Sequence, residues 1–248
     1  MLTRQKEIIK IVNQKQKVDV AVLADKLQVS KVTIRKDLTQ LEELGLLKRQ
    51  HGYAVMADPE NLRARLAVNY DLKVKIAQKA AAFIQDGETI MLESGSTCAL
   101  LAEFLGKSGK HVTIITVSYF IADYVGQYSN LEVFVTGGKY QAASEVVVGA
   151  LAKQMISQFH VKHLFAGTDG FLPQQGFFCN NIERAEMVQA MARQAAEVII
   201  LTDATKFMKA STVKQLELSQ VSQVVTDDQI PADIEEYLRQ SPVTLTII

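Results

Sequence analysis

A short loop of small polar residues has the composition of an anion-binding site. It reads Glu93-Ser94-Gly95-Ser96-Thr97 and lies between an apolar run at 89–92 and a predicted helix. The first N–H groups of a helix have no intrahelical partner, and the positive end of the helix dipole lies beside them. Phosphate suits such a position. Serine and threonine also cap helices that bind nothing, so this loop alone leaves both interpretations open.

Three further loops follow predicted strands and carry complementary groups. They read Thr136-Gly137-Gly138-Lys139, Gly167-Thr168-Asp169-Gly170 and Asp203-Ala204-Thr205-Lys206. Lysine and backbone amides can hold a phosphate, while carboxylates can bind hydroxyl groups. Any one of these loops is as well explained by ordinary turn and cap residues. Their convergence favours a shared site for a phosphorylated sugar or polyol.

A second set of residues suits DNA. Ser30 is a good N-cap for a helix in which Ile34, Leu38 and Leu41 point together into a core. Polar and basic side chains occupy the opposite face and its flank, and a hairpin beyond Gly45 adds more. The predicted DNA-binding residues are Ser30, Lys31, Thr33, Arg35, Lys36, Gln40, Lys48, Arg49 and His51. Basic side chains would neutralise phosphates while polar ones reach base edges. A merely solvated basic face, or a winged helix that binds protein, are the alternatives.

The elements that position this surface fit a winged helix-turn-helix. Residues 4–16 predict a helix and 17–20 a short extended piece. Leu23, Ala24 and Leu27 mark a second helix, and a tight Gln28-Val29 corner leads to the third. Strands are expected at 46–50 and 53–56, around a wing tip at His51-Gly52. We therefore expect a DNA-binding domain over 1–57, a linker over 58–70 that includes Pro59, and a second domain over 71–248.

Alternating strands and helices predict an α/β fold with a mostly parallel sheet for the second domain. A first helix is expected at 71–84. The expected strands are 89–92, 112–116, 131–135, 161–166, 197–201, 224–226 and 243–247. The expected helices that follow are 97–105, 118–127, 149–158, 182–195 and 232–239. In such sheets ligands bind beyond the carboxyl ends of the strands, where the four polar loops lie.

Charge and composition agree with two different modules. Residues 1–57 contain 11 Lys and Arg against 6 Asp and Glu, and the remaining residues contain 16 against 21. A basic module joined to an acidic one fits a nucleic-acid-binding head on another body. No apolar run is long enough for a membrane span, and the first residues lack a signal peptide. With two widely spaced cysteines, these features predict a cytoplasmic protein that does not bind membranes.

The motifs resemble those of a known family. Residues 30–38, Ser-Lys-Val-Thr-Ile-Arg-Lys-Asp-Leu, and residues 45–52, Gly-Leu-Leu-Lys-Arg-Gln-His-Gly, are similar to the DeoR family of bacterial repressors. The resemblance continues through Ser94–Thr97, Thr136–Gly138, Gly167–Gly170, Asn181–Glu186 and Asp203–Phe207, so that it covers essentially the whole chain.

The resemblance implies both a fold and a function. The sensor domain would share the Rossmann-like fold of ribose-5-phosphate isomerase and the CoA transferases. The chain would repress a sugar or polyol operon, bind operator duplex as a dimer or tetramer, and leave it when a phosphorylated sugar binds. The effector-binding residues would be Glu93, Ser94, Gly95, Ser96, Thr97, Gly137, Gly138, Lys139, Asp169, Asn181, Glu183, Glu186 and Lys206.

Several positions depart from the family pattern. The family usually has Asp where Glu93 stands, a second glycine where Tyr53 stands, Asn where Val117 stands, and a basic residue where Val188 stands. These departures leave the predicted fold intact and the identity of the sugar open.

Other kinds of chemistry are less well supported. A sugar-phosphate isomerase or deaminase with a DNA-binding appendage is the alternative function, because Asp169, Glu183, Glu186 and Lys206 could perform acid–base chemistry. The sequence shows no independent catalytic set, and we expect no enzyme activity and no cofactor. His160 and His163 lack a third metal ligand, so no metal site is expected. Cys98 and Cys179 are expected to fill small spaces near the site, and Asp227-Asp228 to be solvated.

Overall fold

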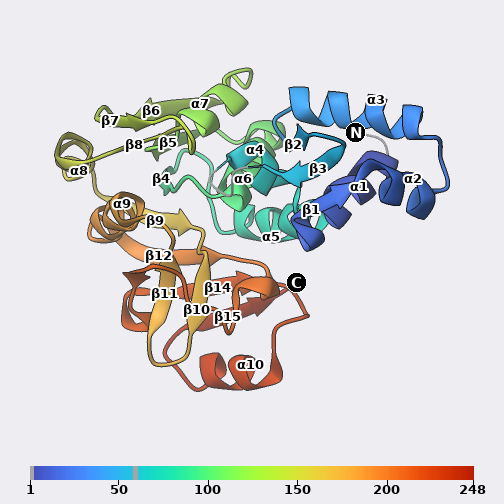
Figure 1. Cartoon of the computed structure of the whole chain (residues 1–248). Helices are drawn as coiled ribbons and strands as arrows, with labels where there is room; N and C mark the ends of the chain where they lie inside the picture. The colour runs from blue at the N-terminus through green and yellow to red at the C-terminus, as the bar shows by residue number, and fades with distance from the viewer. Residues whose placement is uncertain (1–2, 58–60) are drawn as a thin grey trace. The chain divides into compact units, whose positions relative to one another are not determined.

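The chain divides into two compact units, residues 1–70 and 71–248. The structure is a computed structural model that describes residues 3–57 and 61–248 (Figure 1). Residues 58–60 of the predicted linker, Pro59 among them, lie outside the described residues. The rest of that segment is not irregular, since it contains helix α4 (Leu62–Ala67), which Asn61 caps.

The first unit contains three helices and a three-stranded sheet before α4. The helices are α1 (Thr3–Lys15), α2 (Val20–Leu27) and α3 (Lys31–Glu43). The strands are β1 (Lys17–Asp19), β2 (Leu47–Gln50) and β3 (Tyr53–Met56), in the order β1-β3-β2. Ile8, Leu23, Ile34, Leu38 and Leu41 form the centre of its core. The predicted winged helix-turn-helix architecture is present.

Capping residues set the ends of α2 and the start of α3. Asp19 caps α2 by accepting a hydrogen bond from the N–H of Ala21. Gln28 ends α2 in a left-handed conformation with φ 53°. Ser30 then caps α3 by accepting from the N–H of Thr33 at 3.1 Å. The turn between the two helices is therefore fixed by the left-handed C-cap Gln28 and the N-cap Ser30.

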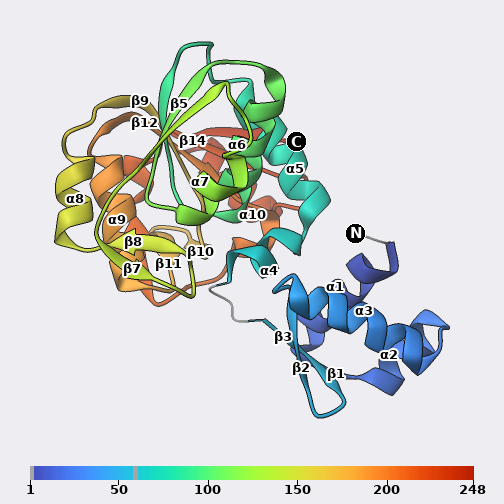
Figure 2. The same ribbon diagram turned by 90° about the horizontal axis from the view of Figure 1, so that it is seen from above.

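The wing is the β2–β3 hairpin, which extends beyond the helices of this unit (Figure 2). Its two-residue tip has positive φ at both His51 and Gly52, which is the geometry of a tight hairpin turn. Tyr53, where the family has a second glycine, lies within β3 and pairs with Gln50 and Asp19. Its ring lies 4.4 Å from Lys17 Nζ. The hairpin therefore closes without a glycine at position 53.

A seven-stranded parallel sheet forms the centre of the second unit, in the order β15-β14-β12-β9-β4-β5-β6. Its strands are β4 (Thr89–Leu92), β5 (Val112–Thr116), β6 (Leu131–Val135), β9 (Val161–Ala166), β12 (Ala195–Leu201), β14 (Gln223–Thr226) and β15 (Thr244–Ile247). All of its strand pairs are parallel. The predicted α/β class and its mostly parallel sheet are confirmed.

Helices cover both faces of this sheet. They are α5 (Tyr70–Ala81), α6 (Ser96–Ser108), α7 (Tyr119–Val125), α8 (Ala150–Ile156), α9 (Ile182–Ala192) and α10 (Ala232–Arg239). Figure 2 shows α6 and α7 on one side and α8 and α9 on the other. Met91, Leu164 and Ile200 belong to the same core cluster as Met187 and Met191 of α9. The inner strands of the sheet are largely buried between two helical layers, while the edge strands β6 and β15 are partly exposed.

Short antiparallel strands were not expected from the sequence. They are β7 (Lys139–Gln141), β8 (Val146–Val148), β10 (Gly170–Leu172), β11 (Gly176–Cys179) and β13 (Val213–Leu216). Strands β10, β11 and β13 form a second sheet, and β7 pairs with β8. A Cβ atom at Gly170 would overlap the carbonyl oxygen of Lys209, and one at Gly176 that of Leu216. These glycines permit close approach of backbone.

One expectation about charged residues was wrong. Asp227 is buried rather than solvated, and its carboxylate accepts from the N–H groups of Ala204 at 2.8 Å and Gln229 at 3.1 Å. It fixes the short 3-10 helix η1 (Ala204–Lys206) after β12. Also buried is His163, whose Nδ1 lies 2.5 Å from Glu88 Oε1. Within the described residues, no helix has the length and apolarity that a membrane crossing needs.

Candidate functional site

Helix α3 presents its predicted DNA-binding side chains outward. Lys31, Arg35 and Lys36 are exposed and Thr33 is half-buried, while Ile34, Leu38 and Leu41 lie at most 1% exposed. The apolar side of the helix is thus fixed in the core, and the basic side faces solvent. A rigid helix with such a face can enter a major groove.

Polar contacts with α1 hold α3 from behind. Arg4 donates to the buried carboxylate of Asp37 through Nε at 2.5 Å and Nη2 at 3.2 Å. The pKa of the Arg4 guanidinium is raised by this hydrogen bonding to Asp37. Gln5 Nε2 donates to Oε1 of Gln40 at 2.8 Å, so the Gln40 oxygen is engaged within the unit. Asp37 therefore positions α3 and does not face a ligand.

The wing is tied to the end of α3. Arg49 donates its backbone N–H to Glu42 Oε1 at 2.7 Å, and its guanidinium lies 3.7 Å from the same carboxylate. It also contacts the Thr39 hydroxyl. Lys48 and His51 are exposed. Arg49 thus links the wing to α3, and its predicted contact with a DNA phosphate stays a prediction.

In the second unit the chain reverses direction across the sheet between β4 and β9. From β4 the sequence moves outward through β5 and β6, and from β9 it moves the other way through β12, β14 and β15. In open α/β sheets the loops after the two central strands separate at such a switch point, and ligands bind in the crevice expected at that carboxyl edge. The Glu93–Thr97 and Gly167–Asp169 loops follow these strands.

Glu93 joins the two loops. It is 4% exposed, and its Oε2 accepts from the N–H of Gly167 at 3.2 Å. Its Oε1 accepts from the Ser94 hydroxyl at 2.8 Å and lies 3.8 Å from Arg184 Nη2. A Cβ atom at Gly95 would lie 3.0 Å from Glu93 Oε2 and 3.5 Å from the Gly167 Cα. Glycine at 95 therefore allows the carboxylate to lie between the loops.

The N-terminus of α6 has no cap of its own. Gly95 occupies the N-cap position and, having no side chain, makes no capping hydrogen bond. Ser96 and Thr97 are each 5% exposed. Neither hydroxyl has a hydrogen-bond partner within the part of the chain that the structure describes. Hydroxyl groups without a protein partner at the start of a helix can donate to a bound anion.

Asp169, Asn180, Arg184 and Gln215 lie around Glu93 and the two loops, and we call these five residues the inner group. Asp169 Oδ2 accepts from the N–H of Asn180 at 3.1 Å, and Arg184 Nη1 lies 3.4 Å from Asn180 Oδ1. Nearby Cys179 is buried, and this burial raises the pKa of its thiol to about 11 despite the positive charge of Arg184. Gln215 Nε2 donates to the carbonyl oxygen of Gly167 at 2.9 Å.

Other predicted effector residues lie outside this inner group. Glu183 pairs with Lys139 at 3.1 Å, and hydrogen bonds from Lys139 and Gln141 lower the pKa of its carboxyl. Glu186 pairs with Lys153 of α8 at 2.6 Å. Asn181 caps α9 by accepting from the N–H of Arg184.

The predicted glycines of the 136–139 loop lie close to β8 and α8. A Cβ atom at Gly138 would lie 2.8 Å from the Val148 carbonyl oxygen, and the N–H of Gly137 contacts Met155 Sδ. Lys206 is half-buried after β12.

Three members of the inner group escaped the sequence analysis, namely Asn180, Arg184 and Gln215. Arg184 lies inside the Asn181–Glu186 motif, where the acidic residues drew the prediction. Arg184 lies three residues after the helix cap Asn181, and this position in the first turn of α9 is the feature of the sequence that could have indicated it. Gln215 belongs to β13, a strand that was not predicted.

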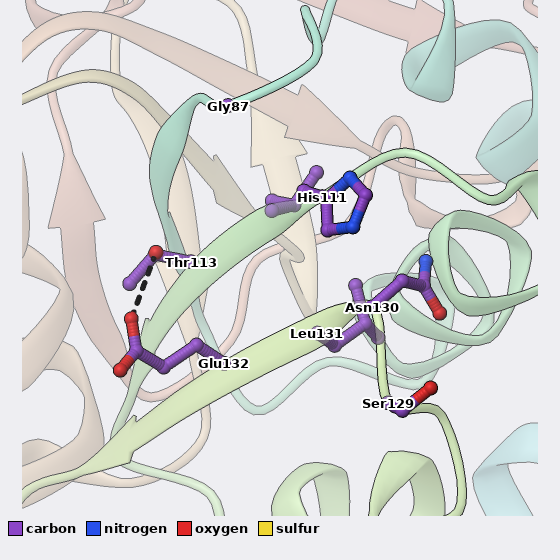
Figure 3. Close-up of a pocket in the computed structure, with 8 residues that line it drawn as sticks. Gly87, His111, Thr113, Ser129, Asn130, Leu131 and Glu132 are labelled. Atoms are coloured by element: carbon purple, nitrogen blue, oxygen red, sulfur yellow. Dashed lines mark hydrogen bonds between the residues drawn. The ribbon is translucent and has the colours of Figure 1, made fainter.

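A separate pocket of about 260 Å³ lies at the amino ends of β5 and β6, opposite the crevice (Figure 3). Three of its polar side chains are already engaged. Asn130 Nδ2 donates to the carbonyl oxygens of Lys110 and Leu105, and Thr113 donates to Glu132. We therefore place the candidate ligand site at the carboxyl edge.

Two family models cover most of the chain. The DeoR-like helix-turn-helix domain matches residues 4–60, and the DeoR C-terminal sensor domain matches residues 68–228. The chain belongs to the DeoR family. Its N-terminal unit is the DNA-binding helix-turn-helix domain of that family, and the resemblance inferred from the motifs is confirmed.

Relatives within the DeoR family have the same extent. The regulator GolR of Listeria innocua is 32% identical and is matched over 92% of this chain and 91% of its own length. A putative aga operon transcriptional repressor of Escherichia coli O157:H7 is 29% identical, with 99% and 93% covered. The L-fucose operon activator of Haemophilus influenzae is 29% identical, with 97% of each covered. These relatives are named as transcriptional regulators.

Solved structures show a weaker likeness. The ribose 5-phosphate isomerase of Methanocaldococcus jannaschii is 23% identical over 57% of this chain and 56% of its own, with a TM-score of 0.43. We draw no conclusion about activity from a likeness at this level.

Proposed function

We propose that this DeoR-family protein represses a sugar or polyol operon and leaves its operator when a phosphorylated sugar binds in the second unit. The uncapped N-terminus of α6 carries this proposal, because its N–H groups and the unpartnered Ser96 and Thr97 hydroxyls suit a phosphate. Asp169 and the half-buried Lys206 border the same edge and can bind the sugar. Relatives named for the aga, L-fucose and lactose systems support a carbohydrate effector.

DNA binding is tested first with the exposed cations of α3. Arg35→Ala and Lys36→Ala should each cost about 1–3 kcal/mol of affinity for the promoter region of the protein's own operon. Lys75→Ala removes an equally exposed positive charge from α5 and should leave that affinity unchanged. Gel-shift titrations at one salt concentration measure all three. Equal affinity for the α3 variants and wild type would contradict the assignment of α3.

The effector is tested with a thermal-shift panel of phosphorylated and unphosphorylated sugars. A ligand that binds the folded state alone raises the melting temperature with concentration. We expect a phosphorylated sugar to raise it and its unphosphorylated form to have little effect. The same mixtures should contain no isomerised or deaminated product. Turnover of a sugar phosphate would favour the enzyme alternative.

Self-association belongs to the same proposal. Operators with two-fold symmetry are read by paired helices whose spacing matches one helical turn of DNA. We therefore expect the free protein to sediment as a dimer or tetramer. A monomer that binds its promoter with one copy per site would contradict this part.

A further inference from the structure

The Glu93–Arg184 ion pair at the crevice is unusual in its burial. Both side chains are 5% exposed, and they come from different elements, Glu93 after β4 and Arg184 in α9. Within the described part of the chain, Lys73 of α5 and Arg184 are the lysine and arginine side chains that are buried. Burying a charge is costly unless other charges or hydrogen bonds compensate it, so such a pair at a ligand site needs an explanation.

The carboxylate of Glu93 has other donors besides Arg184. It accepts from the Ser94 hydroxyl at 2.8 Å and from the N–H of Gly167 at 3.2 Å, both shorter than its 3.8 Å separation from Arg184 Nη2. Arg184 Nη1 also lies 3.4 Å from Asn180 Oδ1, a long contact. Glu93 is thus held mainly by the loops, and its contact with the guanidinium is the looser one.

The charges around the crevice also indicate that a bound anion needs a cation beside it. Glu93 and Asp169 bring two carboxylates to an edge that we propose binds a phosphate. The N–H groups and hydroxyls at the start of α6 carry no formal charge, so an anion there needs a cation to offset the two carboxylates. Arg184 lies next to the carboxylate that Ser94, the residue before Gly95, also contacts. Val188, one turn later in α9, is buried in the apolar core.

We propose that Arg184 supplies the positive charge for anion binding at this crevice, and that Glu93 is its counterion and sets how strongly the site attracts an anion. This inference rests on the proposed function, since it concerns the same ligand site. Glu93 is then a positioning residue for Arg184 and the loops, and does not itself contact the phosphate. The two halves of one ion pair should therefore affect anion binding in opposite directions.

Substitutions of the two residues test this inference in the full-length protein. The probe is inorganic phosphate, added at constant ionic strength and followed by calorimetry and thermal shift. Arg184→Gln should weaken phosphate binding by about 10- to 100-fold, the factor expected for one lost charge-assisted hydrogen bond. Glu93→Gln should strengthen it, because the amide keeps the shape but removes the opposing charge. Weaker binding by Glu93→Gln would contradict its role as counterion.

Loss of folding is separated from loss of binding by a double variant. Arg184→Gln alone leaves a buried carboxylate without its counterion and lowers stability. Glu93→Gln combined with Arg184→Gln replaces the pair by two neutral amides and should fold like wild type without binding phosphate. If the folded double variant binds phosphate as tightly as wild type, Arg184 is not the anion-binding cation.

Controls distinguish this inference from the proposed function itself. On α10, Arg239 and Glu235 form an exposed ion pair with 2.8 Å between the charged atoms. Arg239→Gln or Glu235→Gln breaks this pair and should leave phosphate binding unchanged. If wild type binds neither inorganic phosphate nor any phosphorylated sugar, the proposed effector fails and the inference with it. If wild type binds and Arg184→Gln binds equally well, only the inference fails.

Discussion

Single residues show which contacts of polar side chains could be predicted from the sequence and which could not. The sequence correctly predicted that Ser30 caps α3 and that Glu93–Thr97 follows a strand. It associated Glu183 and Glu186 with the sugar; they pair with Lys139 and Lys153, and their role toward a sugar stays a prediction. It missed Arg184, because whether a charged side chain points inward depends on tertiary packing that the helical period of α9 alone does not reveal.

Cys179 gives a prediction about pH. Burial raises the pKa of its thiol to about 11, so the reactive thiolate is scarce at neutral pH. In a Cys98→Ala protein, iodoacetamide should modify Cys179 slowly between pH 7 and 9, and faster only as the pH approaches about 11. Mass spectrometry of timed samples measures this. Fast alkylation of folded protein at pH 7 would show that the thiol is accessible and ionised.

Asp37 gives a prediction about stability. Its carboxylate is 3% exposed and receives two hydrogen bonds from Arg4. Asp37→Asn should lower the melting temperature of the N-terminal unit by several degrees, because one amide oxygen cannot accept both bonds as strongly. Glu43→Gln, an exposed neighbour on α3, is the control in the same thermal scans. Equal melting temperatures for both variants would contradict the anchoring role of Asp37.

At the scale of elements, a strand could be predicted where its residues form a clear apolar run. Strands 89–92, 112–116, 131–135 and 161–166 occur at the residues predicted for them, because buried parallel strands are nearly continuous apolar runs. The strands β7, β8 and β10 have three residues each and contain or adjoin a glycine. Such short segments carry too little periodicity to be distinguished from loops, so the second sheet could not be predicted.

Helix α3 offers a test that separates capping from DNA contact. Ser30→Ala removes the oxygen that accepts from Thr33 and should cost about 1 kcal/mol of stability. Ser30→Asp keeps a capping oxygen and should retain stability, yet its negative charge should weaken DNA binding. Urea denaturation and gel shifts measure the two effects. If Ser30→Asp binds DNA as well as wild type, Ser30 lies away from the duplex.

The β10–β11 hairpin gives a prediction about packing. Gly170 belongs to a motif that we first associated with the ligand, yet a Cβ there would overlap the Lys209 carbonyl oxygen. Gly170→Ala should therefore destabilise the second unit by about 1–3 kcal/mol. Gly126→Ala, at a helix end where the nearest atoms lie 3.4 Å away, should change stability little. Equal unfolding midpoints in urea would contradict the steric role of Gly170.

At the scale of the whole molecule, the family assignment was predictable because the motifs extend across both units. The two-unit organisation fits a regulator in which one unit binds DNA and the other binds a signal. For regulation, the effector must bind the two DNA-affinity states differently, and a coupling of about 1–3 kcal/mol changes operator affinity about 5- to 150-fold. The coupling is reciprocal, so DNA should weaken effector binding by the same factor.

The most direct test measures binding of labelled promoter DNA by fluorescence anisotropy, with and without a sugar phosphate that raises the melting temperature. We predict that a saturating amount of this ligand raises the dissociation constant for DNA about 5- to 150-fold at constant ionic strength. Its unphosphorylated form should leave that constant unchanged. An identical DNA dissociation constant with and without the saturating sugar phosphate would contradict the proposed regulation.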